Sequence, residues 1–455
     1  MAAAVSYDVW RTPVQVWDAL GEILAAQESP SVTQAFQDSM SNSAYLRPLR
    51  IAQIKALFDL ASPDRFHLVY RGFHVLLLLA LVLAFVAALR VESAVDSAAA
   101  VVALLVLTGL HTFTALVREA FPINHFLEIA VLTLVALNLA ISRGGWWVDA
   151  LAALAFIVAS LTLESGLLVW VVFAAARISG MRGVSTRGLV LVTALLVGYV
   201  GIRAWYLQIG VPALSERSSG FLLERLEPDE LERRFGSALA LFRAYNVGTS
   251  FASVLFAEPR EGLFEFVRAW RDDSVAPRLY LALASSIATT GLIGASALAW
   301  WRRPSQWGHG ERLAFIALAV LAANAVLSFS YTKDDIMTVG GVFYAFAAYA
   351  ALRALLAHAV SWRAWRVAVL SVALLALSGA WAMRSVGVHH VMVTQAFKTR
   401  NDWARLPVAW AREQPLPSAP AALAVIERLR NDAIEAEVPN PQLLPPWRDR
   451  WWGDR

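Results

Sequence analysis

The chain has 455 residues, of which 58% are hydrophobic and 16% charged, and its mean hydropathy is +0.54. A soluble globular chain is about 45–50% apolar and about 25% charged, so this composition excludes an ordinary cytosolic enzyme and indicates a polytopic membrane protein. The absence of cysteine excludes disulfides, thiolate metal sites and cysteine nucleophiles. The formal net charge is +4, and of the 39 basic residues only Lys55, Lys333 and Lys398 are lysine.

Residues 1–71 are predicted to form a polar arm that contains two amphipathic helices. The helical spacing of Val16, Leu20, Ile23 and Leu24 predicts a helix over 13–26, and Pro13 fits its first turn. A second helix is predicted over 47–60, with an apolar face of Leu49, Ile51, Ile54, Leu57, Phe58 and Leu60. Both helices are expected to lie on the membrane surface without crossing it.

Ten hydrophobic segments follow in chain order, and together they predict an all-α bundle of about ten transmembrane helices. They span residues 72–90, 95–117, 125–142, 147–162, 165–178, 187–209, 278–301, 312–331, 338–359 and 366–384. A full span needs about 20 residues, so the fourth and fifth segments are short. We expect them to be tilted or partly re-entrant, and to form a tight hairpin with Glu164 at a membrane surface.

The basic residues of the short loops predict the orientation. Alternate loops carry eleven arginines, whereas the opposite loops carry only Arg118 and Lys333, which places the first set in the cytoplasm. The arm, the loop 210–277 and the tail 385–455 then face outward, as do both termini, and spans 72–209 and 278–384 form the bundle. Residues 1–25 lack the apolar core of a signal peptide, so we expect a leading span before this arm, which makes eleven spans.

Two outer segments have recognisable patterns. Within the loop 210–277, residues 229–256 predict a third amphipathic helix that begins with the acidic residues Asp229, Glu230 and Glu232. The tail is polar, rich in proline at 415–419 and 439–446, and ends in tryptophans that suit a membrane interface.

Candidate functional residues collect at the outer ends of the spans, and no nucleotide-binding loop, HExxH or GxSxG motif accompanies them. Asp8 is a candidate general base for an acceptor hydroxyl, with metal assistance as an option; the alternative is a solvated carboxylate. Asp18 and Asp38 are the other acidic candidates of the arm. Arg47 and Arg50 suit a lipid phosphate, although ordinary snorkelling to headgroups explains them equally.

Histidines and intramembrane charges form the second group of candidates. His67 and His74 are two helical turns apart and share a face, but a metal pair normally uses a spacing of four. Glu164 and the span-embedded Arg203 are functional candidates because an ionisable group in a membrane needs a partner or a water-filled cavity. Asp334 and Asp335 could hold a divalent ion or orient a sugar, or form a solvated loop.

The order of these motifs resembles the GT-C superfamily of multispan glycosyltransferases, and above all its mannosyltransferase-like members that often precede tetratricopeptide repeats. Tyr7-Asp8 is similar to the acidic motif of their first loop, and Arg47-Pro48-Leu49, which follows 39 residues after Asp8, is similar to a Tyr-Arg-Pro-Leu motif. The further similar stretches are Phe66-His67 with Phe73-His74, Leu110-His111, Leu163-Glu164-Ser165, Arg203 and Gly341 to Tyr344.

The chain departs from this family at several positions. Val9 stands where the family has a second acidic residue, Thr112 where it has proline, and Leu163 where it has lysine. No tetratricopeptide repeats follow. The departure at Val9, together with the absence of the family's first span from this sequence, favours a non-catalytic scaffold of the same architecture as one alternative function. A lipid or sugar transporter is the other.

The resemblance implies a GT-C-like fold and an inverting transfer of a sugar from a polyprenyl-phosphate donor to an acceptor hydroxyl on the outer face of the plasma (inner) membrane. It implies Asp8 as general base and Arg47, Arg50 and Arg203 as ligands of the donor phosphate. It implies a substrate lining of His67, His74, His111, Glu164, Asp334, Asp335 and Tyr344. No residue is assigned to a metal, although a divalent cation is an option. The implied partners are the lipid-linked sugar, a glycan, lipid or protein acceptor, and membrane lipids, with no nucleic acid.

Overall fold

The structure is a computed structural model of the whole chain. It describes all residues except 1, 41–44, 62–64, 119–121, 208–232, 234, 237–238, 257–262, 303–306, 331, 333, 414–419, 444 and 453–455. All regular elements of the described residues are helices. Of the third predicted amphipathic helix, the acidic start lies outside the described residues, and a helix runs from Leu239 to Phe256 (α13).

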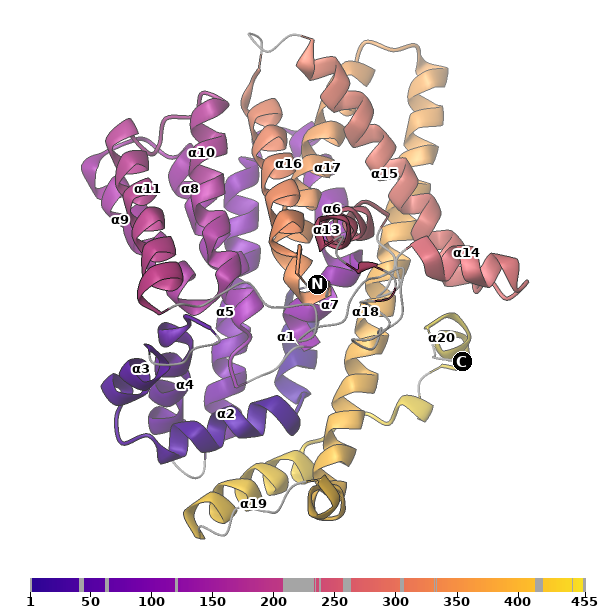
Figure 1. The fold of residues 1–455 in the computed structure, drawn as a ribbon. Coiled ribbons are helices and arrows are strands. Elements are labelled where there is room, and N and C mark those ends of the chain that lie inside the picture. The colour runs from indigo at the N-terminus through magenta and orange to yellow at the C-terminus, as the bar shows by residue number, and fades with distance from the viewer. Residues whose placement is uncertain are drawn as a thin grey trace.

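The apolar segments form the upper part of the molecule as a helical bundle (Figure 1). Its first half consists of α5 (Phe66–Leu89), α6 (Ala94–Gly109), α7 (His111–Arg118), α8 (His125–Ile141), α9 (Trp146–Thr162), η1 (Glu164–Leu167), α10 (Leu168–Ile178), α11 (Thr186–Gly201) and the π-helical turn η2 (Ile202–Tyr206). The second half consists of α13, α14 (Leu263–Arg271), α15 (Pro277–Trp301), α16 (His309–Leu327), η5 (Asp334–Met337), α17 (Thr338–Ala359) and α18 (Ala364–Glu413).

Six described helices are long and apolar enough to cross a membrane, or seven if one bent pair counts as a span. The chain is therefore a helical membrane protein. The bent pair corrects the continuous helix predicted over 95–117: α6 and α7 meet at an angle of 68°, with Leu110 between them. The helices α8 and α9 have 17 residues each and α10 has 11, and η1 joins α9 to α10 as a tight hairpin.

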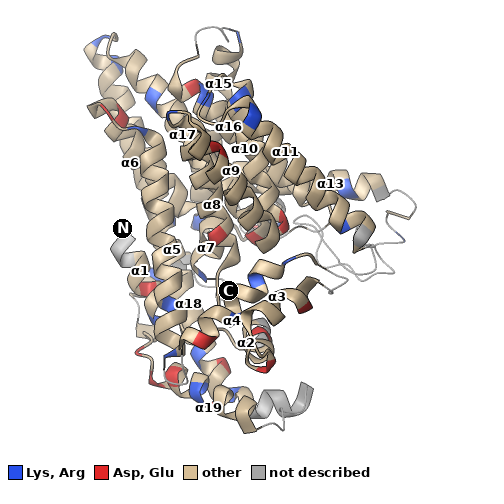
Figure 2. Cartoon of the chain, turned by 90° about the vertical axis from the view of Figure 1, so that its left-hand side faces the viewer, with Lys and Arg blue, Asp and Glu red and all other residues tan. Residues whose placement is uncertain are grey.

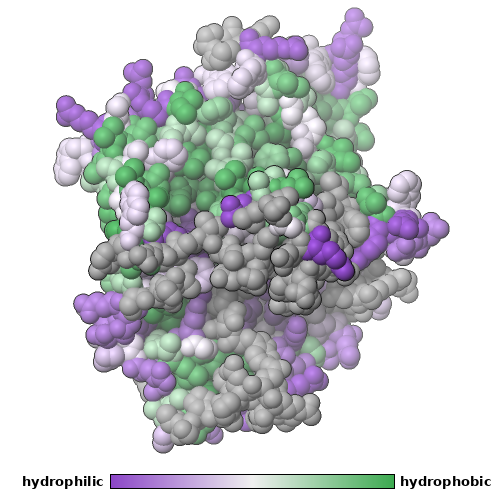
Figure 3. All heavy atoms as spheres, viewed as in Figure 1, coloured by the Kyte–Doolittle hydropathy of each residue, from purple (hydrophilic) through white to green (hydrophobic). Residues whose placement is uncertain are grey.

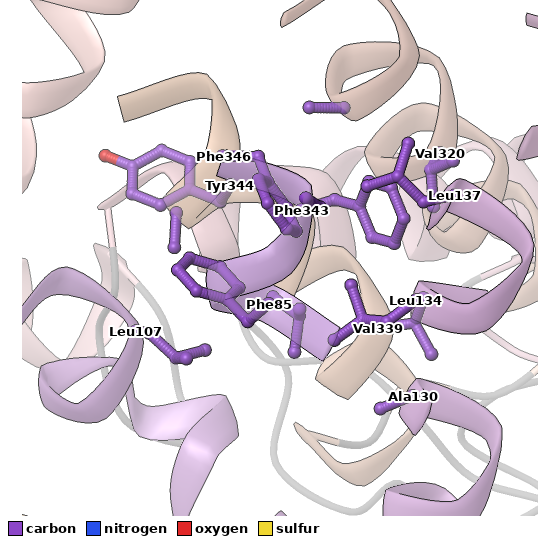
Figure 4. Close-up of a cluster of buried hydrophobic side chains, with 14 of the residues drawn as sticks. Phe85, Leu107, Ala130, Leu134, Leu137, Val320, Val339, Phe343, Tyr344 and Phe346 are labelled. Carbon is purple, nitrogen blue, oxygen red and sulfur yellow. The ribbon is translucent and has the colours of Figure 1, made fainter. Parts of the chain in front are cut away.

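Helix α17 forms the centre of the bundle. Its residues from Thr338 to Leu352 are buried without exception, because it packs between α6, α8, α15 and α16. Figure 4 shows Phe346 of α17 near Phe85 of α5, and the ring centroids of these two residues are 4.2 Å apart. Small residues at 345, 347, 348, 350 and 351 allow these close contacts.

The two ends of the bundle differ in charge. At one end, Arg90 of the α5–α6 turn donates to the Ile141 carbonyl at the end of α8, and Arg312 of α16 donates to the Gly180 carbonyl in the turn between α10 and α11. Basic side chains dominate this end, whereas both signs mix at the other (Figure 2). Figure 3 shows hydrophobic side chains in a band over the bundle between these two ends. Arg90 and Arg312, two of the eleven arginines predicted for one side of the membrane, thus lie at one end of the bundle.

The arm and the tail pack together at the opposite end of the bundle (Figure 1). The arm contains α1 (Ala2–Arg11), α2 (Trp17–Glu28), α3 (Val32–Met40) and α4 (Pro48–Ala61), and the tail adds α19 (Pro420–Glu435), η6 (Pro441–Leu443) and α20 (Pro446–Trp452). Helix α18 is 50 residues long and runs from the apolar band into this region without a break at residue 385.

A small separate core joins the arm to the tail. Leu20 and Ile23 of α2 are fully buried against Trp403 of α18 and Leu429 of α19. The apolar face predicted for α2 is thus confirmed, but it packs on protein. Two details of the arm are corrected: Pro13 precedes α2, which begins at Trp17, and Leu60, expected on an apolar face, is 68% exposed.

Candidate substrate site between the arm and the bundle

Two arginines converge on the carboxylate of Glu164. Arg47 donates from Nε and from one terminal nitrogen to Oε2, at 2.9 and 2.6 Å, and Arg203 donates to Oε1 at 3.2 Å. The three side chains are each about a quarter exposed, at 25%, 24% and 25%. The cluster therefore holds two positive charges against one negative charge at a place that solvent or a ligand can reach.

Local structure explains why these three side chains meet. Arg47 directly precedes Pro48, the first residue of α4, so its side chain extends from the start of this helix towards the bundle. Glu164 opens η1, where α9 turns back into α10, and Gly166 makes this turn possible because a Cβ there would lie 2.1 Å from the Ala159 carbonyl oxygen. Arg203 lies in η2, the π-helical continuation of α11.

Aromatic side chains complete this arginine–glutamate cluster. The Arg47 guanidinium lies 4.1 Å from the ring centroid of Tyr45, and Arg203 also donates to the Tyr199 hydroxyl at 3.4 Å. Burial is the largest influence on Glu164 and raises its pKa. The charge and hydrogen bonds of Arg47, together with the charge of Arg203, outweigh burial, so the pKa of Glu164 lies below its usual value.

A second ion pair lies beside the cluster. Arg50, one turn into α4, pairs with Glu22 of α2. Burial lowers the pKa of Arg50, with the charge of Glu22 acting in the opposite direction and that of Arg47 adding to the lowering. Arg47 and Arg50 are therefore close enough to repel each other, but each has its own carboxylate.

A series of polar contacts continues from the cluster along the lower end of the bundle. Gln53 donates to Glu128 at 2.6 Å, and Glu128 lies 3.3 Å from Nδ1 of His125. The side chain of Asn124 then donates to the carbonyl of Leu116 at the end of α7. His74 of α5 contacts the same carbonyl oxygen through Nε2 at 2.9 Å.

Asp8 forms a separate pair with a residue far along the chain. Its Oδ2 lies 2.5 Å from Nδ1 of His389 in α18. Helix α1 packs against α5, α7 and α18, and the nearby Trp10 meets His67 edge-to-face with ring centroids 5.7 Å apart. Asp8 is therefore a partnered group inside a packed helix, in contrast to a solvated carboxylate near a chain end.

Three consecutive carbonyls after α1 are held by buried side chains. Arg71, which is 1% exposed, donates to the carbonyls of Thr12 and Pro13 at 2.5 and 2.7 Å. Trp403 of α18 donates to the carbonyl of Val14 at 2.7 Å. These bonds satisfy carbonyls that would otherwise be buried without partners, and they fix the segment that follows Asp8.

The remaining predicted residues lie apart from these contacts, and some of their side chains are not among the described residues. Tyr344 is fully buried and its hydroxyl contacts that of Thr290 at 2.8 Å. Asp335 is 1% exposed and lies 3.9 Å from Arg118. Asp334 lies in η5, but its side chain and that of Asp18 are outside the described residues, as is all of Lys333. Asp38 accepts from Gln34 on the exposed surface of α3.

His111 lies in the bend between α6 and α7, near a buried arginine of α18. Arg384 donates to the Gly109 carbonyl and to the hydroxyls of Ser285 and Ser286, and lies over the ring of Trp381. Its charge acts on His111. Arg384 thus stabilises the broken span by bonding a carbonyl that the break leaves without a helical partner.

The structure brings some candidates together and not others. Arg47, Glu164 and Arg203 form one cluster with Arg50 beside it, whereas Asp8 forms its own pair. Among the described residues no group of three or more histidine, aspartate or glutamate side chains could hold a metal ion. Sequence reasoning missed His389, Arg71, Tyr199 and Arg384. The doublet His389-His390 in an otherwise apolar stretch was the available signal for the first of these.

Comparisons with known proteins found no match: no family model, no curated protein and no solved structure matches the chain.

Proposed function

We propose that the chain is a membrane glycosyltransferase that moves a sugar from a polyprenyl-phosphate donor to an acceptor hydroxyl, with inversion at the anomeric carbon, on the outer face of the plasma (inner) membrane. The arginine–glutamate cluster is the observation that carries this proposal. Two accessible guanidiniums at the junction of an apolar bundle and a polar arm suit an anionic headgroup whose lipid tail stays in the membrane.

The cluster favours a phosphate for reasons of charge and geometry. A guanidinium offers donors in a fixed fork, and Arg47 already uses two of them on one carboxylate oxygen. The excess positive charge of the cluster is available to a phosphate, and Glu164 holds both arginines in place before the ligand arrives. As the glycosidic bond breaks, the leaving phosphate gains negative charge, which the same arginines stabilise.

The Asp8–His389 pair supports the second half of the reaction. A carboxylate and an imidazole within hydrogen-bond distance form a unit that can take a proton from a hydroxyl. Asp8 lies on α1 of the arm, and α1 packs against α18, which carries His389. A base and a phosphate site on one side of a membrane are the two parts that this transfer needs.

Two alternatives predict different behaviour. A transporter is expected to place polar groups for solutes at mid-depth in several spans, but the described polar groups around Arg384 are used in helix–helix hydrogen bonds. A non-catalytic scaffold keeps the architecture and binds the lipid without turnover. The departure at Val9 favours the scaffold.

The test uses the full chain reconstituted in lipid vesicles with undecaprenyl phosphate that carries tritiated mannose or glucose. We expect saturable binding and release of the labelled sugar to water or an added alcohol. Arg203→Gln should weaken binding by about 10- to 100-fold, because a charge-assisted hydrogen bond contributes roughly 1.5–3 kcal/mol. Arg177→Gln is the matched control: Arg177 donates to Thr186 at the opposite end of the bundle and should leave binding unchanged.

The outcomes separate the three functions. Binding with sugar release supports the transferase. Binding without release supports the scaffold, and movement of the intact labelled donor between leaflets supports the transporter. Absence of binding, or equal effects of Arg203→Gln and Arg177→Gln, overturns the proposed phosphate site.

A further inference from the structure

The two members of the Asp8–His389 pair are not equally accessible. The Asp8 side chain is 12% exposed, whereas that of His389 is 38% exposed. Asp8 is carried by α1, which packs against three other helices, and His389 projects from α18 beside it. A substrate hydroxyl arriving from solvent therefore meets the imidazole more readily than the carboxylate.

The contact also determines which ring nitrogen is available. An ionised carboxylate only accepts hydrogen bonds, so the proton in this contact lies on Nδ1 of His389, which donates to Oδ2 of Asp8. In the neutral ring, Nε2 then carries the free lone pair. Within the described part of the chain, Asp8 is the hydrogen-bond partner of His389, and it engages Nδ1 alone.

The backbone around Asp8 suits an orienting role. The Thr12 hydroxyl donates to the Asp8 carbonyl at 2.9 Å, so the residue is tied to the last turn of α1. The carbonyls of Thr12, Pro13 and Val14 are held by Arg71 and Trp403, which are both buried. Asp8 and α18 are therefore joined by two independent connections, and the carboxylate is held where it fixes the imidazole plane.

We propose that His389 is the catalytic base of the transfer and that Asp8 is its positioning residue; this inference rests on the proposed function. Nε2 of His389 takes the proton of the acceptor hydroxyl while the acceptor oxygen forms a bond to the anomeric carbon. The bond between that carbon and the phosphate oxygen breaks, and its electron pair leaves on the polyprenyl phosphate. Asp8 stabilises the imidazolium, which then returns its proton to water.

Chemical rescue distinguishes this assignment from Asp8 as the base. In vesicles that contain the labelled donor, His389→Gly should lower sugar release by about 10²–10⁴-fold, the usual contribution of a general base. Added imidazole should restore part of the release, and added formate should not. For Asp8→Gly, we expect no rescue by formate, because the carboxylate does not itself take the proton.

The matched control is His390→Gly. His390 is the adjacent histidine of α18 but is 4% exposed, so its loss should not produce an imidazole-dependent activity. Donor binding should stay unchanged in His389→Gly, which separates loss of the base from loss of the phosphate site or of the fold.

Accessibility of His389 can be tested without turnover. Diethyl pyrocarbonate, followed by mass spectrometry, should modify His389 and spare His390. Lack of modification at His389, rescue of Asp8→Gly by formate, or an active His389→Gly overturns the assignment while leaving the proposed function intact. Donor binding without turnover in the wild type supports the scaffold, and it overturns the proposed transferase activity together with this assignment. Absence of donor binding overturns the proposed function itself.

Discussion

Two carboxylates on the arm side of the bundle, Glu164 and Asp8, have partners of different kinds. Glu164 lies between two guanidiniums, which keep their charge at any pH that the protein meets. Asp8 meets a single imidazole, the side chain that exchanges a proton most readily near neutral pH. The first arrangement suits a fixed electrostatic site, and the second suits proton transfer. Mutation of Glu164 should therefore affect stability and donor binding, whereas mutation of Asp8 should affect turnover.

The largest expected effect is on turnover. Asp8→Asn should lower sugar release by about 10²–10⁴-fold, because the asparagine amide cannot stabilise an imidazolium at His389. Expression, thermal midpoint and donor binding should remain close to those of the wild type. A fully active Asp8→Asn protein would show that Asp8 takes no part in turnover and would contradict the comparison.

The next effect is on stability. Glu164→Gln leaves two partly buried guanidiniums facing each other and should lower the free energy of unfolding by roughly 1–3 kcal/mol; a fully buried pair would lose more. Unfolding of the detergent-solubilised protein measures this loss. Asp8→Asn is the comparison, with an expected loss below about 1 kcal/mol. Equal losses at the two sites would contradict the distinction.

The pH dependence of stability should follow Glu164. The pKa of this carboxyl is lower in the folded protein than its usual value of about 4.3, so its contribution is complete above that pH. The contribution is lost as the pH falls through the folded pKa. Wild type should therefore lose stability in this acid range more steeply than Glu164→Gln, as measured by unfolding at successive pH values. Parallel curves would show that Arg47 and Arg203 do not stabilise the ionised form.

The smallest effect is expected at an ion pair outside both sites. Lys55 and Asp59 pair within α4 at 2.7 Å, and the Asp59 side chain is 49% exposed. Asp59→Asn should change the free energy of unfolding by less than about 0.5 kcal/mol and leave donor binding unchanged. This value is the baseline for the Glu164 result. A loss as large as that of Glu164→Gln would show that the arginine–glutamate cluster stabilises the protein no more than an exposed ion pair.

The sequence predicted the elements whose patterns are local. Apolar runs located the helices of the bundle, and the spacing of Leu20 and Ile23 located α2. The hairpin at Glu164 was also predicted, because a carboxylate between two short apolar segments belongs at their turn. The pairing of Arg47 and Arg203 with Glu164 was not predicted, although all three were candidates, since each contact joins segments far apart in the chain.

Other features depend on long-range contacts without a local signal. The bend after Gly109 relies on Arg384, which lies 275 residues further along the chain. His389 acquires its place beside Asp8 only because α18 continues past the expected end of its span. A segment predicted as a polar tail thus contributes His389 to the contact, and the arm contributes Asp8.

The length of α18 has a mechanical consequence. At about 1.5 Å per residue the helix is roughly 75 Å long, and its apolar window is the least buried of the candidate spans. Arg384 bonds α18 to α6 and α15 and acts as a pivot. The part of α18 between this pivot and Ala364 is about 30 Å long, while His389 lies about 7 Å from the pivot on the other side. If α18 turns as a rigid rod, a displacement of its Ala364 end by the surrounding lipid reaches the Asp8–His389 contact reduced about fourfold, so the pair is insulated from fluctuations of the bilayer.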